Sequence, residues 1–268
     1  MNEAMQSFIA GLARQAGALL LGYFRSATLR RDIKGEGAWD LVTEADHAAE
    51  RAIIAAVRAR FPDHDVFGEE SGRSGLTSRS LWLIDPLDGT LNFSRGLPTW
   101  GVSVGLAEDG EVRYGAFYDP LHDELFYAEK GQGATLNGAP LRASGLADPH
   151  DAVVYCSVAH GEQEELARRN VRLLWGHVMR LRMTGSVGSA LAAVAAGRMD
   201  AAIELRGGPW DYAAGGLLVR EAGGHTTTFD GAPLRADAHT VFAAATPALH
   251  RALYDILSNQ PSAISRQP

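Results

Sequence analysis

Two aspartates lie three positions apart at the end of an apolar run, and their residue types suit a metal site. Asp85 and Asp88 follow the segment Trp82–Ile84, and Pro86 stands between them. Carboxylates are hard oxygen donors of the kind that bind Mg²⁺. Proline fixes its own φ, so the chain that leaves the apolar run is stiff. The spacing therefore indicates two carboxylates held in fixed positions after a buried strand.

The backbone of the same loop adds groups that suit a phosphate. Leu87 offers a carbonyl between the two acids, and Gly89 lets a ligand approach the chain closely. If a short helix begins at Thr90, the N–H groups of Gly89 and Thr90 point outward and bind an anion. An Asp-Pro turn followed by a helix that Asp88 caps explains the same residues equally well.

Three further acidic positions have ordinary explanations when each is taken alone. Glu69 lies in a polar turn, Asp211 lies at the start of a predicted small-residue helix, and Asp46 lies in the first turn of another helix. A solvated turn accounts for the first, and favourable helix capping or dipole interactions account for the other two. Their combination with the Asp85–Thr90 loop is more informative than any one of them.

The motifs together resemble those of the inositol monophosphatase family, within the wider lithium-sensitive, Mg²⁺-dependent phosphatase superfamily. Their order and spacing fit that family, and the resemblance extends to about Leu257. The matching segments are Gly68-Glu69-Glu70-Ser71, Trp82-Leu83-Ile84-Asp85-Pro86-Leu87-Asp88-Gly89-Thr90-Leu91-Asn92-Phe93, Trp210-Asp211-Tyr212-Ala213-Ala214-Gly215-Gly216 and Glu221-Ala222-Gly223-Gly224. The second segment is far more specific than a lone glycine pattern.

The resemblance implies a role for each matching residue. The expected metal ligands, for two or three Mg²⁺ ions, are Glu69, Asp85, the Leu87 carbonyl, Asp88 and Asp211. The expected catalytic residues are Asp46 and Thr90, which orient the attacking water, together with Glu69. The expected substrate contacts are Leu87, Asp88, Gly89, Thr90, Gly188, Ser189, Ala190, Glu204 and Asp211. Lys34 lies near a lysine of the family pattern but is one position out of register, and it is left unassigned.

The implied reaction is hydrolysis of a phosphate monoester, with myo-inositol phosphate as the expected substrate and a metal-activated water as the nucleophile. Alternatives within the superfamily are histidinol-phosphate phosphatase, fructose-1,6-bisphosphatase and 3′-phosphoadenosine nucleotide phosphatase. The pair Leu91-Asn92 favours the inositol or sugar branch. A different class is a binding protein, since some bacterial relatives act in transcription or ribosome assembly. Relatives are commonly homodimers, and a homodimer is expected here.

Composition limits the classes of partner and the compartment that we expect for this protein. The formal charge of −7 gives no electrostatic basis for binding nucleic acid or an anionic membrane. Cys156 is the single cysteine, which fits a reducing compartment. The first residues carry an acid where a signal peptide has cations, and no apolar run is long enough to cross a bilayer. We therefore expect a cytoplasmic enzyme whose partner is a small phosphorylated polyol or sugar.

The periodicity predicts a layered fold of mixed type. Helical spacing covers residues 3–25 and 43–60, short strands follow from 81 to 136, and helices alternate with strands after 152. With the resemblance, this indicates an α/β fold (α+β, layered), an alternating α-β-α-β-α sandwich of the inositol monophosphatase/fructose-1,6-bisphosphatase type. Expected units are residues 1–148 with most metal ligands, 149–258 with the substrate contacts and the last ligand, and a flexible tail at 259–268.

Three other motif classes are excluded. The sequence Gly101-Val102-Ser103-Val104-Gly105 matches a nucleophile elbow, but alternation continues through it into a hairpin signal at Asp109-Gly110, so we expect Ser103 in a strand. No H-E-x-x-H pair and no P-loop sequence is present, which excludes a zincin and a P-loop kinase.

Overall fold

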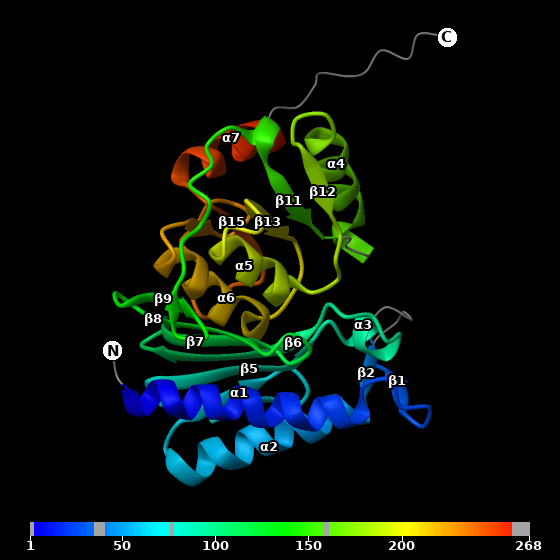
Figure 1. Cartoon of the computed structure of the whole chain (residues 1–268), viewed down its shortest axis with the longest axis vertical. Helices are drawn as coiled ribbons and strands as arrows, with labels where there is room; N and C mark the ends of the chain where they lie inside the picture. The colour runs from blue at the N-terminus through cyan, green and yellow to red at the C-terminus, as the bar shows by residue number, and fades with distance from the viewer. Residues whose placement is uncertain (1–2, 35–40, 76–77, 158–160, 259–268) are drawn as a thin grey trace.

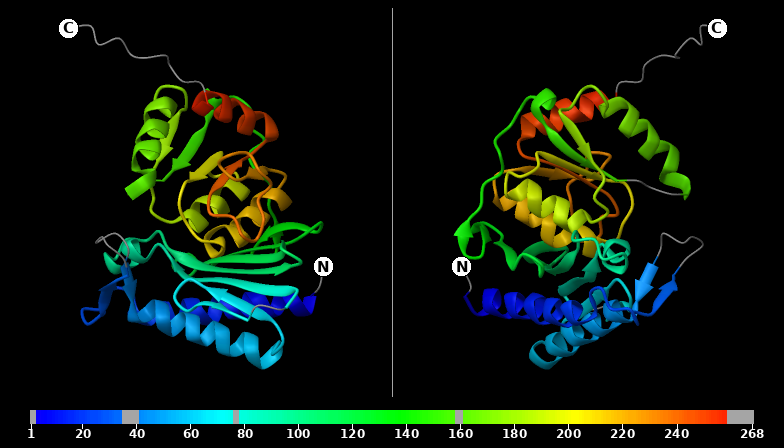
Figure 2. Two further views of the ribbon diagram at one scale, coloured as in Figure 1. Left: turned by 180° about the vertical axis from the view of Figure 1, so that it is seen from behind. Right: turned by 45° about the vertical axis from the view of Figure 1, so that its right-hand side comes forward.

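The computed structural model describes residues 3–34, 41–75, 78–157 and 161–258. Its elements form five stacked layers, two of sheet and three of helix (Figure 1). The two views of Figure 2 agree that one helical layer separates the sheets and that the other two layers lie outside them. The alternating α-β-α-β-α sandwich predicted from the sequence is confirmed.

The larger sheet contains eight strands and is built mostly from consecutive hairpins. Its strands are β3 (Asp65–Gly68), β4 (Gly72–Ser74), β5 (Ser80–Asp88), β6 (Gly101–Glu108), β7 (Glu111–Asp119), β8 (Glu124–Glu129), β9 (Gly133–Leu136) and β10 (Ala139–Pro140). They lie in the order β10-β9-β8-β7-β6-β5-β3-β4. Only β3 and β5 pair in parallel, so the turn after β3 and the end of β5 lie at the same edge of the sheet.

The smaller sheet lies in the second half of the chain and mixes parallel and antiparallel pairs. Its strands are β11 (Val153–Cys156), β12 (Arg180–Arg182), β13 (Ala201–Glu204), β14 (His225–Thr227) and β15 (Val241–Ala244), in the order β12-β11-β13-β15-β14. The central strand β13 is fully buried and ends at Glu204. A short hairpin of β1 (Arg31–Ile33) and β2 (Leu41–Thr43) stands apart from both sheets.

The first helical layer consists of α1 (Glu3–Tyr23) and α2 (Glu44–Arg60), which pack on the outer face of the larger sheet (Figure 1). Each buries one apolar stripe, as the helical spacing in the sequence predicts. Thr43 caps α2 because its hydroxyl accepts a hydrogen bond from the Ala45 N–H at 3.2 Å. This cap fixes where α2 begins, and therefore where the acidic residues of its first turns lie.

The middle layer consists of α5 (Val187–Ala195) and α6 (Pro209–Glu221), which lie between the two sheets. Both helices are rich in small residues, and nine residues of α6 are buried. At Gly115 of β7, a Cβ would lie only 2.7 Å from the Cα of Ala214, so glycine is needed for α6 to approach the sheet this closely. The close approach brings the N-terminus of α6 to the end of β5.

The third helical layer covers the outer face of the smaller sheet with α4 (Glu164–Leu174) and α7 (Pro247–Ser258) (Figure 1). The remaining elements are short: α3 (Thr90–Ser94) and two 3₁₀ turns, η1 (Pro149–Asp151) and η2 (Gly161–Gln163). No helix in the described part of the chain is long and apolar enough to cross a membrane. The predicted tail at 259–268 lies outside the described residues.

The sequence predicted the long elements more accurately than the short ones. The first helix ends at Tyr23, two residues before the predicted position, and the helix predicted from Thr43 begins at Glu44. Ser103 lies within β6, as expected, and its hydroxyl donates to the Trp210 carbonyl at 3.1 Å. β12 and β14 were not predicted, because strands of three residues are too short for an alternating pattern to be recognised.

Candidate functional site

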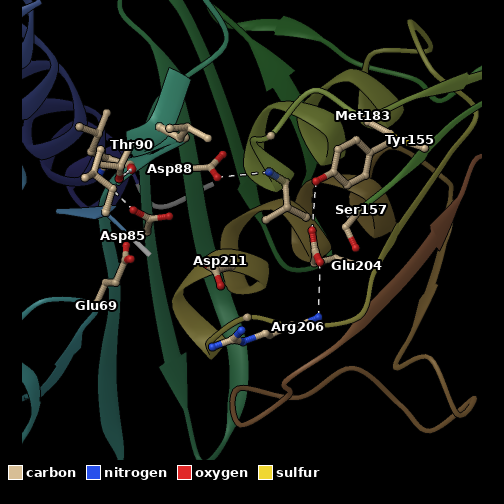
Figure 3. Close-up of a pocket in the computed structure, with 17 residues that line it drawn as sticks. Glu69, Asp85, Asp88, Thr90, Tyr155, Ser157, Met183, Glu204, Arg206 and Asp211 are labelled. Atoms are coloured by element: carbon tan, nitrogen blue, oxygen red, sulfur yellow. Dashed lines mark hydrogen bonds between the residues drawn. The ribbon is translucent and has the colours of Figure 1, made fainter. Parts of the chain in front are cut away.

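A cavity of about 460 Å³ opens where the two sheets and the middle helices meet (Figure 3). Its walls come from six separate parts of the chain: β2, the β3–β4 turn, the end of β5 with the start of α3, β11 with the residue after it, the loop that leads into α5, and the segment that joins β13 to α6. The residues that line it are Leu41, Glu69, Asp85, Leu87, Asp88, Gly89, Thr90, Leu91, Tyr155, Ser157, Met183, Gly185, Val187, Glu204, Arg206, Gly207 and Asp211.

Three carboxylates converge at one side of this cavity. Glu69 comes from the β3–β4 turn, Asp85 from β5 and Asp211 from the first turn of α6, and one oxygen of each lies within 4.8 Å of the others. Two of the three are held by backbone groups: Asp85 Oδ1 accepts from the Leu87 N–H at 2.9 Å, and Asp211 Oδ2 accepts from the Gly208 N–H at 2.6 Å. This grouping has the donor type and spacing that a divalent cation requires.

The carboxylates carry negative charge that the protein compensates poorly. Burial raises the pKa of Asp85 well above its usual value, and the neighbouring charges of Glu69 and Asp88 raise it further. The pKa of Asp211 is raised well above its usual value by the same two effects. Burial also raises the pKa of Asp88, to about 6. A bound divalent cation would remove this repulsion, so the site fits a metal ion on electrostatic grounds.

Asp88 does not cap the short helix that follows it. The N-cap of α3 is Gly89, with φ of 92°, and no side chain bonds to it. Instead, Asp88 Oδ2 accepts from the Gly188 N–H at 2.8 Å and the Ser189 N–H at 3.3 Å, and the Ser186 hydroxyl also donates to it. The carboxylate therefore accepts hydrogen bonds from the N–H groups that the first turn of α5 leaves unpaired. This turn lies about 100 residues further along the chain, and its partial positive charge favours an anion.

Asp46 and Thr90 form a hydrogen-bonded pair beside the carboxylate cluster. Asp46 Oδ2 accepts from the backbone N–H of Thr43 at 2.8 Å and from its hydroxyl at 2.5 Å, which completes a capping box at the start of α2. Thr90 Oγ1 lies 2.9 Å from Asp46 Oδ1 and 3.0 Å from the Leu87 carbonyl, and it can donate its proton to either. Burial raises the pKa of Asp46, while the Thr43 hydrogen bonds oppose that shift.

The opposite side of the cavity is less acidic and carries hydroxyl groups. The Tyr155 hydroxyl donates to Glu204 Oε2 at 3.0 Å (Figure 3). The Leu205 N–H donates to Glu204 Oε1, also at 3.0 Å. Burial raises the pKa of Glu204. Ser157 and Met183 complete this wall. The arrangement offers a fixed carboxylate and two hydroxyl groups to a ligand in the cavity.

The predicted substrate contacts are only partly brought to the cavity. Leu87, Asp88, Gly89, Thr90, Glu204 and Asp211 line it, whereas Gly188, Ser189 and Ala190 do not. Ala190 is fully buried. Asn92 lies behind the wall, where its amide donates to the carbonyls of Thr99 and Thr184 at 2.7 Å each. Asn92 therefore fixes the loop before α5 and does not itself line the cavity.

Lys34 is a site residue that sequence reasoning missed. Its ammonium lies 2.8 Å from Glu69 Oε1 and also pairs with Glu70. Burial acts to lower the pKa of Lys34, but the charges of Glu69 and Glu70 outweigh it and raise the pKa. The lysine directly follows β1, and it was left unassigned because it stands one position out of register with the family pattern. Tyr155, which lies within β11, and Arg206, which follows β13, were also missed, because neither segment bears a motif.

Comparison with known proteins identifies the same family that the sequence motifs resemble, and the match covers nearly the whole chain. A model of the inositol monophosphatase family matches residues 1–262. The Nus factor SuhB of Escherichia coli (strain K12) is 40% identical over 223 residues, which cover 82% of this chain and 83% of that protein. A protein of Thermotoga maritima named fructose-1,6-bisphosphatase/inositol-1-monophosphatase is 36% identical over 222 residues, with the same coverage of 82% and 83%.

Solved structures share the architecture. The extragenic suppressor protein suhB from Bartonella henselae superposes with a TM-score of 0.90 at 32% identity, over 96% of this chain and 99% of that chain. The inositol monophosphatase from Anabaena (Nostoc) sp. PCC 7120 superposes with a TM-score of 0.84 at 32% identity, over 95% of each chain. The fold is therefore shared with these proteins.

The raised carboxylate pKa values predict how stability depends on pH and on metal. Because the pKa of Asp88 is about 6 and that of Glu70 about 7 in the folded protein, the folded state binds more protons than the unfolded state between about pH 4 and 7. In chelator, the melting temperature should therefore fall as pH rises through this range. Millimolar Mg²⁺ should raise it by about 2 °C or more at pH 7.5 and by less at pH 5.5.

Scanning calorimetry at the two pH values, with and without Mg²⁺, measures both effects. A sodium salt at the same ionic strength as the Mg²⁺ solution is the control for general charge screening. An equal Mg²⁺ effect at both pH values, or none at either, would contradict the assignment of a cation site to these carboxylates.

Proposed function

The chain belongs to the inositol monophosphatase family, and from this premise we propose that it is a Mg²⁺-dependent phosphate monoester hydrolase that acts on myo-inositol phosphate. The observation that carries the proposal is the convergence of Glu69, Asp85 and Asp211, with one oxygen of each within 4.8 Å of the others, beside the hydrogen-bonded pair of Asp46 and Thr90. The first group supports a metal site, and the second supports a site for the nucleophile.

The proposed metal ligands are Glu69, Asp85, Asp88, Asp211 and the Leu87 carbonyl. Bound there, Mg²⁺ would supply Lewis-acid stabilisation of the phosphoryl oxygens and a lowered pKa for the attacking water. The protein's own part is to hold the ligands in place before the cation arrives. The Leu87 and Gly208 N–H groups do so for Asp85 and Asp211. Two or three ions are proposed, on the family pattern.

Asp46 and Thr90 are proposed to orient the attacking water. When the Thr90 hydroxyl donates to Asp46, the lone pairs on its oxygen can accept a hydrogen bond from the water. Asp46 cannot turn away, because two hydrogen bonds from Thr43 hold it. The backbone N–H groups of Gly89 and Thr90 are proposed to hold the phosphate in line with that water. No covalent intermediate with the protein is required, since positioning and charge supply most of the rate enhancement.

The polyol is proposed to lie against Glu204, Tyr155 and Ser157. Glu204 is fixed by the Tyr155 hydroxyl and two backbone N–H groups, so its free lone pairs can accept hydrogen bonds from substrate hydroxyls in a defined direction. The contacts that the family resemblance assigns to Gly188, Ser189 and Ala190 would be indirect. Gly188 and Ser189 lie behind Asp88 and fix its carboxylate through their backbone N–H groups.

A phosphate-release screen tests the proposal. The purified protein with Mg²⁺ should hydrolyse myo-inositol 1-phosphate faster than histidinol phosphate or 3′-phosphoadenosine 5′-phosphate. Asp46→Asn should lower kcat by about 100-fold or more, because the Thr90 hydroxyl loses a charged acceptor that fixes its direction. The melting temperature of the variant serves as the control for folding. Absence of phosphate release from every compound in the screen would refute the enzymatic proposal.

A second candidate substrate is fructose 1,6-bisphosphate, and Arg206 is the observation that favours it. It is the one cationic residue among the described residues that line the cavity, and its side chain is exposed (Figure 3). Once the carboxylates are neutralised by metal, a free guanidinium in the cavity favours a substrate with a second anionic group. The Thermotoga maritima relative is named for activity on both classes of substrate.

Arg206→Gln separates the two substrates. The change should lower kcat/KM for fructose 1,6-bisphosphate by about tenfold, the loss of one charge-assisted hydrogen bond, and change the value for inositol 1-phosphate by less than about threefold. Arg182→Gln is the matched control, because Arg182 is exposed on β12 and its guanidinium donates to the Leu181 carbonyl instead of lining the cavity. Equal losses on both substrates would rule out a role for Arg206 in binding a second phosphate.

A homodimer is also proposed, on the basis of an apolar surface beside β12. Trp175, Met179 and Met183 are 75%, 47% and 48% exposed, and β12 is an edge strand of the smaller sheet. Exposed apolar residues next to an unpaired strand edge are typical of an association surface. Light scattering should give twice the chain mass of 28.6 kDa, and Trp175→Asp should give the monomer mass. A monomeric wild-type protein would contradict the dimer.

A binding role remains the proposal of a different class, because the Escherichia coli relative is named a Nus factor. Such a role would not require the carboxylate cluster. A partner that the Asp88→Asn variant retains as well as the wild-type protein does would support a function separate from hydrolysis.

A further inference from the structure

A second buried acid lies on the same helix as Asp46, one turn further along. Glu50 is 3% exposed and Asp46 is fully buried, and both face the larger sheet from α2. Residues four apart lie on the same face of a helix, about 6 Å from each other. None of the functions described above uses Glu50. A buried carboxylate is costly unless something is gained from its charge or its hydrogen bonds.

The hydrogen bonds of Glu50 go to the turn that carries Glu69. Glu50 Oε1 accepts from the Glu70 N–H at 3.0 Å and from the Ser71 N–H at 3.4 Å. At Gly68, a Cβ would lie 2.1 Å from the same oxygen, so any larger side chain there would displace the carboxylate. The turn is therefore shaped around Glu50.

Glu69 is held on both sides as a result. Its own N–H donates to the Ile84 carbonyl of β5 at 3.0 Å, and the next N–H along the chain donates to Glu50. The first bond fixes the turn relative to the strand that carries Asp85. The second fixes it relative to the helix that carries Asp46.

We propose that Glu50 is a positioning residue for the metal site. Through α2, it sets the distance between the turn that carries Glu69 and the Asp46–Thr90 pair, so that cation and water sites stay in register. The inference rests on the proposed function, since it takes Glu69 as a metal ligand. Glu50 itself touches neither metal nor substrate. Groups that orient metal ligands commonly change metal affinity by 10- to 100-fold when they are removed.

Metal affinity measured by calorimetric titration of the full chain with Mn²⁺ tests the proposal without a substrate. Glu50→Ala should weaken binding by about tenfold or more, because the Glu70 N–H loses its acceptor. Glu50→Gln keeps a carbonyl oxygen in place and should stay within about threefold of the wild-type value. Rescue by glutamine would show that the acceptor, and not the charge, is required.

Asp65→Ala is the matched control. Asp65 is also a buried acid on the larger sheet, 5% exposed, and its carboxylate accepts from the Ser78 N–H at 3.3 Å without touching the turn that carries Glu69. This variant should lose thermal stability and keep its Mn²⁺ affinity. Wild-type affinity in Glu50→Ala, or an equal loss of affinity in Asp65→Ala, would overturn the proposal.

Two further outcomes stay interpretable. If Glu50→Ala does not fold, Glu50→Asp withdraws the acceptor by one methylene; weakened Mn²⁺ binding in that variant supports the proposal, and unchanged binding overturns it. If the wild-type protein binds Mn²⁺ but releases no phosphate from any substrate, the proposed hydrolase function fails. The comparison of metal affinities between the Glu50 variants then still decides the role of Glu50.

Discussion

Repulsion among buried carboxylates is the constraint on which the rest of this structure depends. Glu69, Asp85 and Asp211 converge within 4.8 Å, and Asp88 lies close enough that its charge raises the pKa of both aspartates. A fold would not collect these charges for its own stability, because like charges in a buried site cost free energy. They stay together because backbone N–H groups hold Asp85 and Asp211, the N-terminus of α5 holds Asp88, and the Lys34 ammonium pairs with Glu69.

The layered architecture supplies those anchors from distant parts of the chain. The small residues of α6 let its N-terminus reach the end of β5, which places Asp211 beside Asp85. The N-terminus of α5 holds Asp88, and α2 holds Asp46 directly. The site therefore depends on the packing of the first helical layer, the larger sheet and the middle helical layer. Lys34 is the one described cation paired with the cluster, and it contacts Glu69 from a hairpin outside both sheets.

The sequence predicted what depends on local pattern. Helical spacing located α1 and α2 within two residues, and the Asp85–Thr90 loop was recognisable because its residue types and spacing are unusual. It could not predict relations between distant segments. A cap on the helix beside it was the alternative explanation for Asp88, but its carboxylate accepts from the N-terminus of α5, about 100 positions away. Glu50 and Tyr155 carry no motif, and only the folded chain brings them to Glu70 and Glu204. Strands of three residues, such as β12, are too short for a period to be recognised.

Anomalous diffraction from crystals soaked in Mn²⁺ tests most directly whether the carboxylate cluster exists to hold a cation. The expected result is a strong peak within about 2.3 Å of oxygens from Glu69, Asp85 and Asp211, with a water or buffer oxygen completing the coordination. A further peak beside Asp88 and Asp211 would fit a second ion. A saturating soak that leaves these carboxylates without a peak, while Lys34 stays bound to Glu69, would contradict a metal-dependent function for this site.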